Sequence, residues 1–201
     1  MSDTMKVLGI YGSPRKGGNT DTLLDEVLRG CRDAGAEVKS IRCTDLNMSG
    51  CVECGGCDQT GTCVINDDMQ GVYPMLVEAD VIVLASPMFF YGITSQAKAL
   101  IDRCQALWCK RLLEKGPGRK KGYEGGKGYL VAAGATKGKN LFQSSELVAK
   151  YFYDALDMSY EGGVFVRGVE GPEDVRKHPD VLRQAYELGK TAVTSRSSEE
   201  S

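Results

Sequence analysis

The chain has 201 residues, of which 42% are hydrophobic and 26% charged, and its net charge is −2. This balance predicts one ordinary globular domain with a sizeable core, and it excludes a generally basic, nucleic-acid-binding protein. The polar first residues and the shortness of apolar runs such as 81–85 predict neither a secretory signal nor a membrane span, so we expect a cytoplasmic protein without a membrane partner.

Five short segments have the composition of strands, at residues 7–11, 38–43, 81–85, 129–133 and 160–166. Segments with helical spacing of apolar residues alternate with them, beginning at about residues 19, 66, 94, 142 and 179. This alternation predicts an α/β fold, with one doubly wound parallel sheet covered by helices on both faces. We expect a single domain over residues 1–193 and a disordered polar tail over 194–201.

Three loops of special composition, 12–20, 86–92 and 133–138, follow predicted strands, where ligands bind in sheets of this kind. The first, Gly12 to Thr20, lies before a helix N-terminus, whose unpaired N–H groups and dipole attract phosphate. Asn19 or Thr20 can cap that helix. The loop has neither the dinucleotide nor the triphosphate glycine pattern. A phosphate site is favoured, and a plain helix cap is the alternative.

The second loop combines a stiff turn with a flat, polarizable surface. Pro87 restricts the backbone, and Met88, Phe89, Phe90 and Tyr91 follow it. Aromatic and thioether groups of this kind can support a planar ring system. The alternative is an aromatic cluster in the core or in an oligomer interface.

Four cysteines have the spacing C-x2-C-x2-C-x5-C, at Cys51, Cys54, Cys57 and Cys63. Three thiolates at successive x2 intervals suit three corners of a 4Fe–4S cluster, with the last cysteine as the fourth ligand. Because the run follows a strand, we expect it at the same sheet edge as the other loops. Zinc, a redox disulfide and a motif that binds no metal are the alternatives. The remaining cysteines should be small core residues: Cys31, Cys43, Cys104 and Cys109.

The segment 110–127 is rich in glycine and basic residues. We interpret it as a solvated loop. The alternative is a docking surface for an acidic electron donor or a nucleotide phosphate. Its candidate residues are Lys110, Arg111, Arg119, Lys120 and Lys121.

Together, the loops Gly12–Thr20 and Ser86–Phe90 resemble those of the flavodoxin-like, NADPH-dependent FMN reductase superfamily. With the cysteine run and Asp67-Asp68-Met69, the chain resembles the iron–sulfur flavoproteins of anaerobic microbes over roughly residues 5–165. The resemblance implies FMN, with its phosphate on Ser13, Arg15, Gly18, Asn19 and Thr20. It implies a flavin ring against Pro87, Met88, Phe89 and Phe90, with Gly134, Ala135 and Thr136 on a third side. It also implies a 4Fe–4S cluster on Cys51, Cys54, Cys57 and Cys63.

The function predicted is that of an electron-transfer flavoprotein that couples one-electron steps at a cluster with two-electron steps at FMN. No catalytic side chain is named, because the chemistry belongs to the cofactors. NAD(P)H or a ferredoxin is the expected donor, and the resemblance implies a homo-oligomer, a dimer or tetramer. The alternatives are a cluster-free NAD(P)H-dependent FMN, quinone or nitro reductase, and a flavin-binding carrier or sensor without turnover.

Overall fold

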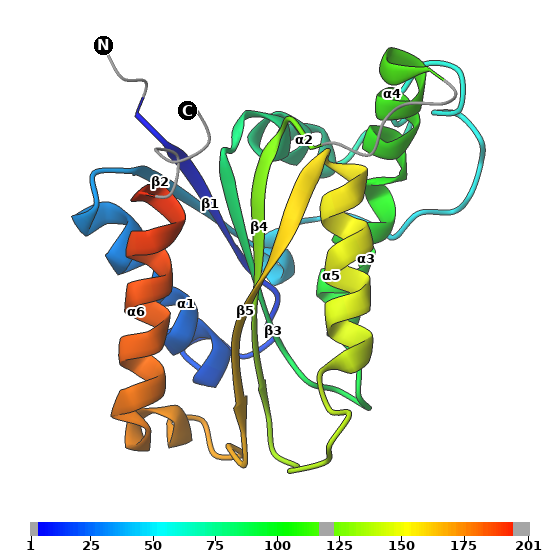
Figure 1. Cartoon of the computed structure of the whole chain (residues 1–201). Helices are drawn as coiled ribbons and strands as arrows, with labels where there is room; N and C mark the ends of the chain where they lie inside the picture. The colour runs from blue at the N-terminus through cyan, green and yellow to red at the C-terminus, as the bar shows by residue number, and fades with distance from the viewer. Residues whose placement is uncertain (1–3, 117–122, 195–201) are drawn as a thin grey trace.

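The computed structural model describes residues 4–116 and 123–194, and alternates strands with helices along the chain (Figure 1). The strands are β1 (Lys6–Tyr11), β2 (Glu37–Arg42), β3 (Val81–Pro87), β4 (Gly126–Gly134) and β5 (Met158–Arg167). The α-helices are α1 (Asn19–Asp33), α2 (Met69–Glu78), α3 (Ser95–Arg103), α4 (Gln105–Lys115), α5 (Gln143–Ala155) and α6 (Pro179–Thr194). Two short 3-10 helices complete the list, η1 (Cys43–Asp45) and η2 (Asp174–Lys177).

The five strands form one parallel sheet in the order β2-β1-β3-β4-β5. The chain moves outward from β1 to β2, then returns past β1 to β3, so the strand order reverses between β1 and β3. Such a reversal leaves a crevice beyond the carboxyl ends of the strands. The predicted doubly wound sheet is therefore confirmed, and the crevice lies where the special loops begin.

Strand β3 shows why the sheet is covered on both faces. Val81, Val83 and Ala85 pack into the core layer that includes α1 and α6. Ile82 and Leu84, which alternate with them, pack into the layer that includes α2, α3 and α5. Side chains of a strand point alternately to opposite faces, so a continuous apolar run requires helices on both. Figure 1 shows α1 and α6 on one side of the sheet, with α3 and α5 on the other.

Helices α1 and α6 are in backbone contact. A Cβ atom on Gly30 would lie 2.1 Å from the carbonyl oxygen of Tyr186, and one on Gly189 would lie 2.0 Å from that of Val27. Real side chains do not tolerate such distances, so glycine is required at both positions. The sixth helix is thereby fixed directly on the first.

The basic segment is partly helical, so the expectation of a solvated loop was wrong for Lys110 and Arg111. The helix expected from about residue 94 to 108 breaks at Cys104, and α4 continues to Lys115. Arg111 is buried, with salt bridges of 2.8 Å to Asp154 and 2.7 Å to Asp157. These partners come from the end of α5, so local composition could not reveal them.

The candidate docking residues Arg119, Lys120 and Lys121 lie outside the described ranges, as do residues 195–201 of the polar tail. Thr194, the first residue of that tail, is helical and ends α6. Across residues 4–116 and 123–194, no helix combines the length and apolarity needed to cross a membrane.

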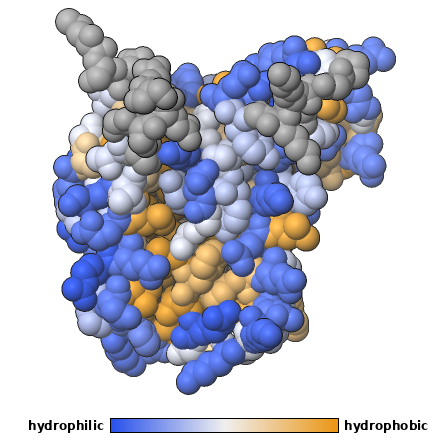
Figure 2. All heavy atoms as spheres, in the orientation of Figure 1, coloured by the Kyte–Doolittle hydropathy of each residue, from blue (hydrophilic) through white to orange (hydrophobic). Residues whose placement is uncertain are grey.

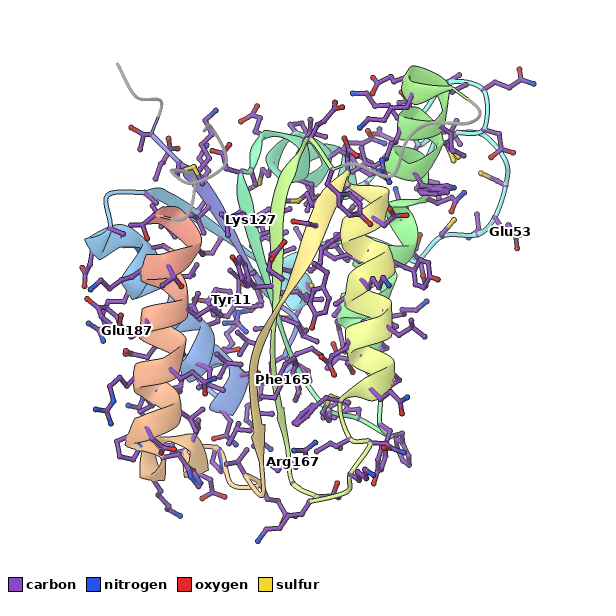
Figure 3. All side chains as sticks on the ribbon, viewed as in Figure 1. Tyr11, Glu53, Lys127, Phe165, Arg167 and Glu187 are labelled. Carbon is purple, nitrogen blue, oxygen red and sulfur yellow. The ribbon has the colours of Figure 1, made fainter. Side chains whose placement is uncertain are left out.

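Figure 2 shows hydrophobic residues gathered in the space between α6 and α5. The edge strand β5, which carries Phe165, runs there (Figures 1 and 3).

Candidate functional site

A pocket of about 280 Å³ opens at the carboxyl ends of β1, β3 and β4. All of the residues predicted for the flavin line it except Phe90 and Thr136, which are both exposed. The three expected loops are therefore brought together as the topology predicted. Pro14, Ala133, Val169 and Glu170 also line the pocket.

The first loop is a tight turn that leads into α1. The Ser13 hydroxyl accepts the backbone N–H of Arg15 at 3.1 Å and donates to the Arg15 carbonyl at 3.0 Å. Helix α1 begins at Asn19 with Gly18 at the cap position and no side-chain cap, so the prediction of an Asn19 or Thr20 cap was wrong. The first N–H groups of a helix have no intrahelical partner. An anion in this pocket can accept hydrogen bonds from these N–H groups.

A buried carboxylate holds this loop from beneath. Asp21 is 2% exposed, accepts the backbone N–H of Gly17 at 2.9 Å and pairs with Arg42 at 2.7 Å. The Arg42 guanidinium also lies 4.5 Å from the ring centre of Tyr11, at the end of β1 (Figure 3). The pair neutralises Asp21, so the acidic group supports the turn without placing net negative charge under the pocket.

The side chain of Asn19 is engaged with the loop after β5. Its amide nitrogen donates to the carbonyl of Gly171 at 2.8 Å, and its oxygen accepts the N–H of Val175 at 3.0 Å. Asn19 thus joins the start of α1 to the segment that contributes Val169 and Glu170. Sequence reasoning missed this fourth loop, although its position after a parallel strand places it at the same edge.

The second loop is a hairpin with an exposed aromatic tip. Phe89 and Gly92 exchange two backbone hydrogen bonds of 2.9 Å. Phe90 and Tyr91 between them are both left-handed, with φ of 50° and 61°. Bulky residues rarely adopt this conformation, and such strain is concentrated at functional sites. The hydroxyl of Ser144 donates to the Tyr91 carbonyl, which fastens the hairpin to α5.

The four motif cysteines line a second cavity, of about 540 Å³, together with residues of α3 and α4 such as Arg103 and Gln105. Among the residues that the structure describes, the two pockets share no lining residue. The expectation that the cysteine run lies at the flavin edge was therefore wrong. In Figures 1 and 3 the loop that carries Glu53 lies beside α4, whereas Arg167 marks the carboxyl end of β5 at the bottom of the view.

A buried arginine fixes the end of the cysteine loop. The Arg103 side chain is fully buried and pairs with Asp67, with N–O distances of 2.6 and 3.0 Å. It also donates to the Ser49 carbonyl at 3.1 Å and to the Cys63 Sγ at 3.4 Å. Both ends of the loop are thus tied to one guanidinium. Arg103 was not predicted from the sequence, because the helix expected to begin at about residue 66 accounted for Asp67 without a distant partner.

The electrostatics of this contact favour a thiolate. Burial acts to raise the pKa of the Cys63 thiol, but hydrogen bonds with the Ile65 backbone, Tyr73 and Arg103 outweigh it and lower the pKa. A thiolate is the form that binds metal. The arrangement therefore prepares Cys63 as a ligand.

The chemistry of the donors fits an iron–sulfur cluster. Four soft thiol ligands converge on one cavity, with a buried cation beside one of them. The tight turns come from left-handed residues, with φ of 54° at Glu53, 70° at Gly55 and 66° at Gly61. The Glu53 N–H also points to the Cys51 sulfur, at 3.4 Å.

The four cysteines outside the motif are buried, as expected of core residues. Burial raises the pKa of Cys31 to about 11 and that of Cys43 to about 12, so these thiols are unreactive. Cys109 differs from them, because its Sγ lies 3.9 Å from the Sγ of Cys57. It therefore belongs both to α4 and to the surroundings of the cysteine loop.

Comparison with known proteins shows the family to which the chain belongs. The family model of the NADPH-dependent FMN reductases matches residues 5–164. An iron–sulfur flavoprotein of Archaeoglobus fulgidus is 33% identical over 174 residues, which cover 86% of this chain and 75% of that protein. One of Methanocaldococcus jannaschii is 41% identical over 103 residues, but these cover 51% of this chain and only 53% of that protein. This chain therefore matches about half the length of some curated relatives and three quarters of another.

A solved structure supports the fold independently. The NAD(P)H:quinone oxidoreductase from Methanothermobacter marburgensis superposes with a TM-score of 0.72. The match covers 94% of this chain and 96% of that one, at 14% sequence identity. At this identity, the likeness concerns the fold alone.

Proposed function

The chain belongs to the NADPH-dependent FMN reductase family of flavin-dependent oxidoreductases and, within it, to the iron–sulfur flavoproteins, and on this premise we propose that it is an electron-transfer flavoprotein carrying FMN and one 4Fe–4S cluster. The observation that carries the proposal is the presence of two separate pockets in one chain. One is built from a helix N-terminus and strand-end loops, and the other from four thiols.

In the first pocket, the residues of the loop before α1 hold the phosphate of FMN. The backbone of Gly18, Asn19 and Thr20 supplies N–H donors at the positive end of the helix dipole, and Arg15 supplies charge. Pro87, Met88 and Phe89 provide one wall for the flavin ring, and Gly134 with Ala135 provides another. A side chain on Gly134 would crowd this wall, since a Cβ would lie 2.8 Å from the Cδ2 of Leu141 and 3.3 Å from the Cβ of Met88.

In the second pocket, Cys51, Cys54, Cys57 and Cys63 are the cluster ligands, and Arg103 offsets negative charge at Cys63. FMN exchanges two electrons and a 4Fe–4S cluster exchanges one, so their combination converts between donors and acceptors of the two kinds. The protein contributes position and electrostatics. No side-chain acid, base or nucleophile is required.

The donor is NAD(P)H or a ferredoxin-like protein, and the protein works as a homo-oligomer in the cytoplasm. The family supports a nicotinamide donor. In a homo-oligomer, one subunit's thiol pocket and another's flavin pocket, which have separate linings among the described residues, can approach each other. The eight free cysteines suit a reducing compartment.

Anaerobic purification followed by FMN, iron and sulfide analysis tests the proposal. We expect one FMN and about four irons per chain, with visible absorbance that bleaches on reduction. Replacement of Cys54 by Ala should remove iron and leave FMN in place. Iron-free wild-type protein with full NAD(P)H turnover would instead identify a cluster-free FMN, quinone or nitro reductase. Cofactor reduction without turnover of any acceptor would identify a carrier or sensor.

A further inference from the structure

Three metal-ligating side chains meet between the cysteine loop and α4. Their sulfur and oxygen atoms, from Cys57, Asp58 and Cys109, all lie within 4.8 Å of one another. Cys109 is not part of the four-cysteine motif and reaches the site from the middle of a helix. Its thiol is buried, Cys57 is half-buried and Asp58 is exposed, so the group is open to ions on one side.

Two of the three spacings between these atoms match the edges of a metal tetrahedron, and the third is at most 4.8 Å. Zinc–sulfur bonds of ~2.3 Å at a tetrahedral angle place two sulfurs roughly 3.8 Å apart, and a carboxylate oxygen at ~2.1 Å lies roughly 3.6 Å from each sulfur. The Cys57 and Cys109 sulfurs are 3.9 Å apart, and Cys109 Sγ is 3.7 Å from an Asp58 oxygen. Little movement is needed to place one ion between the three.

The backbone explains why the loop stays at this distance. A Cβ atom on Gly61 would lie 2.6 Å from Cβ and 2.7 Å from Cα of Lys110, the residue after Cys109. The loop therefore rests directly on α4. The N–H of Gly61 donates to the Cys57 carbonyl at 2.8 Å, which closes a turn around Asp58. The two sides of the site are thus held by packing and by the turn.

We propose that Cys57, Asp58 and Cys109 form a mononuclear site for a thiophilic divalent cation of the zinc class, which overlaps the four-cysteine cluster site at Cys57 alone. Binding converts two thiols and one free M²⁺ into two metal–thiolate bonds and releases two protons, with no change of oxidation state. Water completes the tetrahedron on the exposed side. Gln105, whose amide nitrogen lies 3.5 Å from Cys109 Sγ, orients that thiolate.

The site shares Cys57 with the proposed cluster, so the two metals compete for one sulfur. This consequence rests on the proposed function, whereas the site itself needs only the three side chains named. A chain that holds the divalent ion cannot complete the cluster. The position of Cys109 therefore makes assembly sensitive to the ratio of zinc to iron.

Anaerobic titration of Co²⁺ into the metal-free, reduced full chain tests the site, because cobalt reports thiolate ligands by its charge-transfer bands and a tetrahedron by its visible bands. The titration is done in a Cys51→Ala/Cys54→Ala background, which removes two exposed motif thiols and prevents a four-thiolate site. We expect one Co²⁺ per chain, displaced by Zn²⁺. Adding Cys109→Ala should weaken binding by at least ~100-fold, more than the ~10–100-fold cost of losing an outer-shell partner.

Two further variants in the same background separate the site from a remnant of the motif. Cys63→Ala should keep the cobalt spectrum. Asp58→Ala, an exposed change that leaves the fold intact, should weaken binding at least tenfold. Unchanged binding in Cys109→Ala, or loss in Cys63→Ala alone, would overturn the proposal. The iron content of a Cys109→Ala chain with all four motif cysteines is a separate measurement. Normal iron content in that variant supports the four cysteines as the cluster ligands, whatever the result of the Co²⁺ titration.

Discussion

Replacing Arg103 by Met should destabilise the protein far more than removing a neighbouring charge of the same helix. The Arg103 side chain is fully buried, and its partner Asp67 is 12% exposed. Removing one member of a buried pair costs about 3–5 kcal/mol, because the other charge is left uncompensated. Asp67 keeps the N–H of Met69, at 3.1 Å, as a donor, so we expect the lower end, about 3 kcal/mol.

The control is Lys98→Met, since Lys98 pairs with Asp102 on the same helix, with both side chains more than 40% exposed. An exposed i,i+4 pair contributes about 0.3–0.5 kcal/mol. Urea unfolding of the metal-free, reduced protein at pH 7 measures both losses. A loss in Arg103→Met no greater than that in Lys98→Met would show that the buried Arg103–Asp67 pair does not stabilise the fold. In the double variant with Asp67→Asn, much of the loss should be recovered.

The same pair gives a pH dependence of known sign. Hydrogen bonding to Arg103 holds the pKa of Asp67 below its ordinary value in the folded protein. A depressed folded pKa contributes stability that is full above the unfolded pKa, near about 4, and is lost as the pH falls through the folded pKa. The stability difference between wild type and Arg103→Met should therefore be largest near neutrality and contract below about pH 4. A difference that stays constant with pH would contradict this assignment.

Three further predictions concern the two pockets and the aromatic hairpin. Arg15→Gln should weaken FMN binding about tenfold and leave riboflavin binding unchanged, as charge lost at a phosphate requires; equal weakening of both, by fluorescence titration, would contradict a phosphate role. Phe90→Asn should raise the free energy of unfolding by about 1 kcal/mol, because Phe90 is exposed and left-handed and Asn tolerates that conformation. Cys51→Ala should lose iron at constant FMN, whereas Cys43→Ala should keep both, as measured by metal analysis.

The sheet and the flavin edge could be predicted because their signals are local. The continuous apolar run 81–85 is typical of a strand buried on both faces, and the loop at 12–20 joins a strand to a helix. The alternation of elements then fixes the edge at which the loops meet. The loops that these rules bring together do line the first pocket, whereas Phe90 and Thr136 lie outside it, and Phe90 is exposed at the tip of a strained turn. The roles of the lining residues toward a flavin stay a prediction.

The place of the cysteine loop could not be predicted because it depends on distant pairs. Arg103 is 36 residues from Asp67, and Cys109 is 52 from Cys57. Nothing in the spacing of the motif indicates that two later helices supply a buried guanidinium, from α3, and a fifth thiol, from α4. The carboxyl ends of parallel strands share one edge of the sheet, but a long loop after a strand can leave that edge. The cysteine loop does so because its contacts are with α3 and α4.

The bond between Asn19 and Val175 also has a consequence for biosynthesis. Its two ends are 156 residues apart, so the loop 12–20 leaves the ribosome long before the loop after β5, which completes the same pocket. At about 5–20 residues per second, that interval is roughly 8–30 seconds. Through this time α1 also lacks α6, the helix with which it shares backbone contact. The nascent chain therefore presents this pocket without its fourth wall until the segment after β5, which includes Val169 and Glu170, has been synthesised.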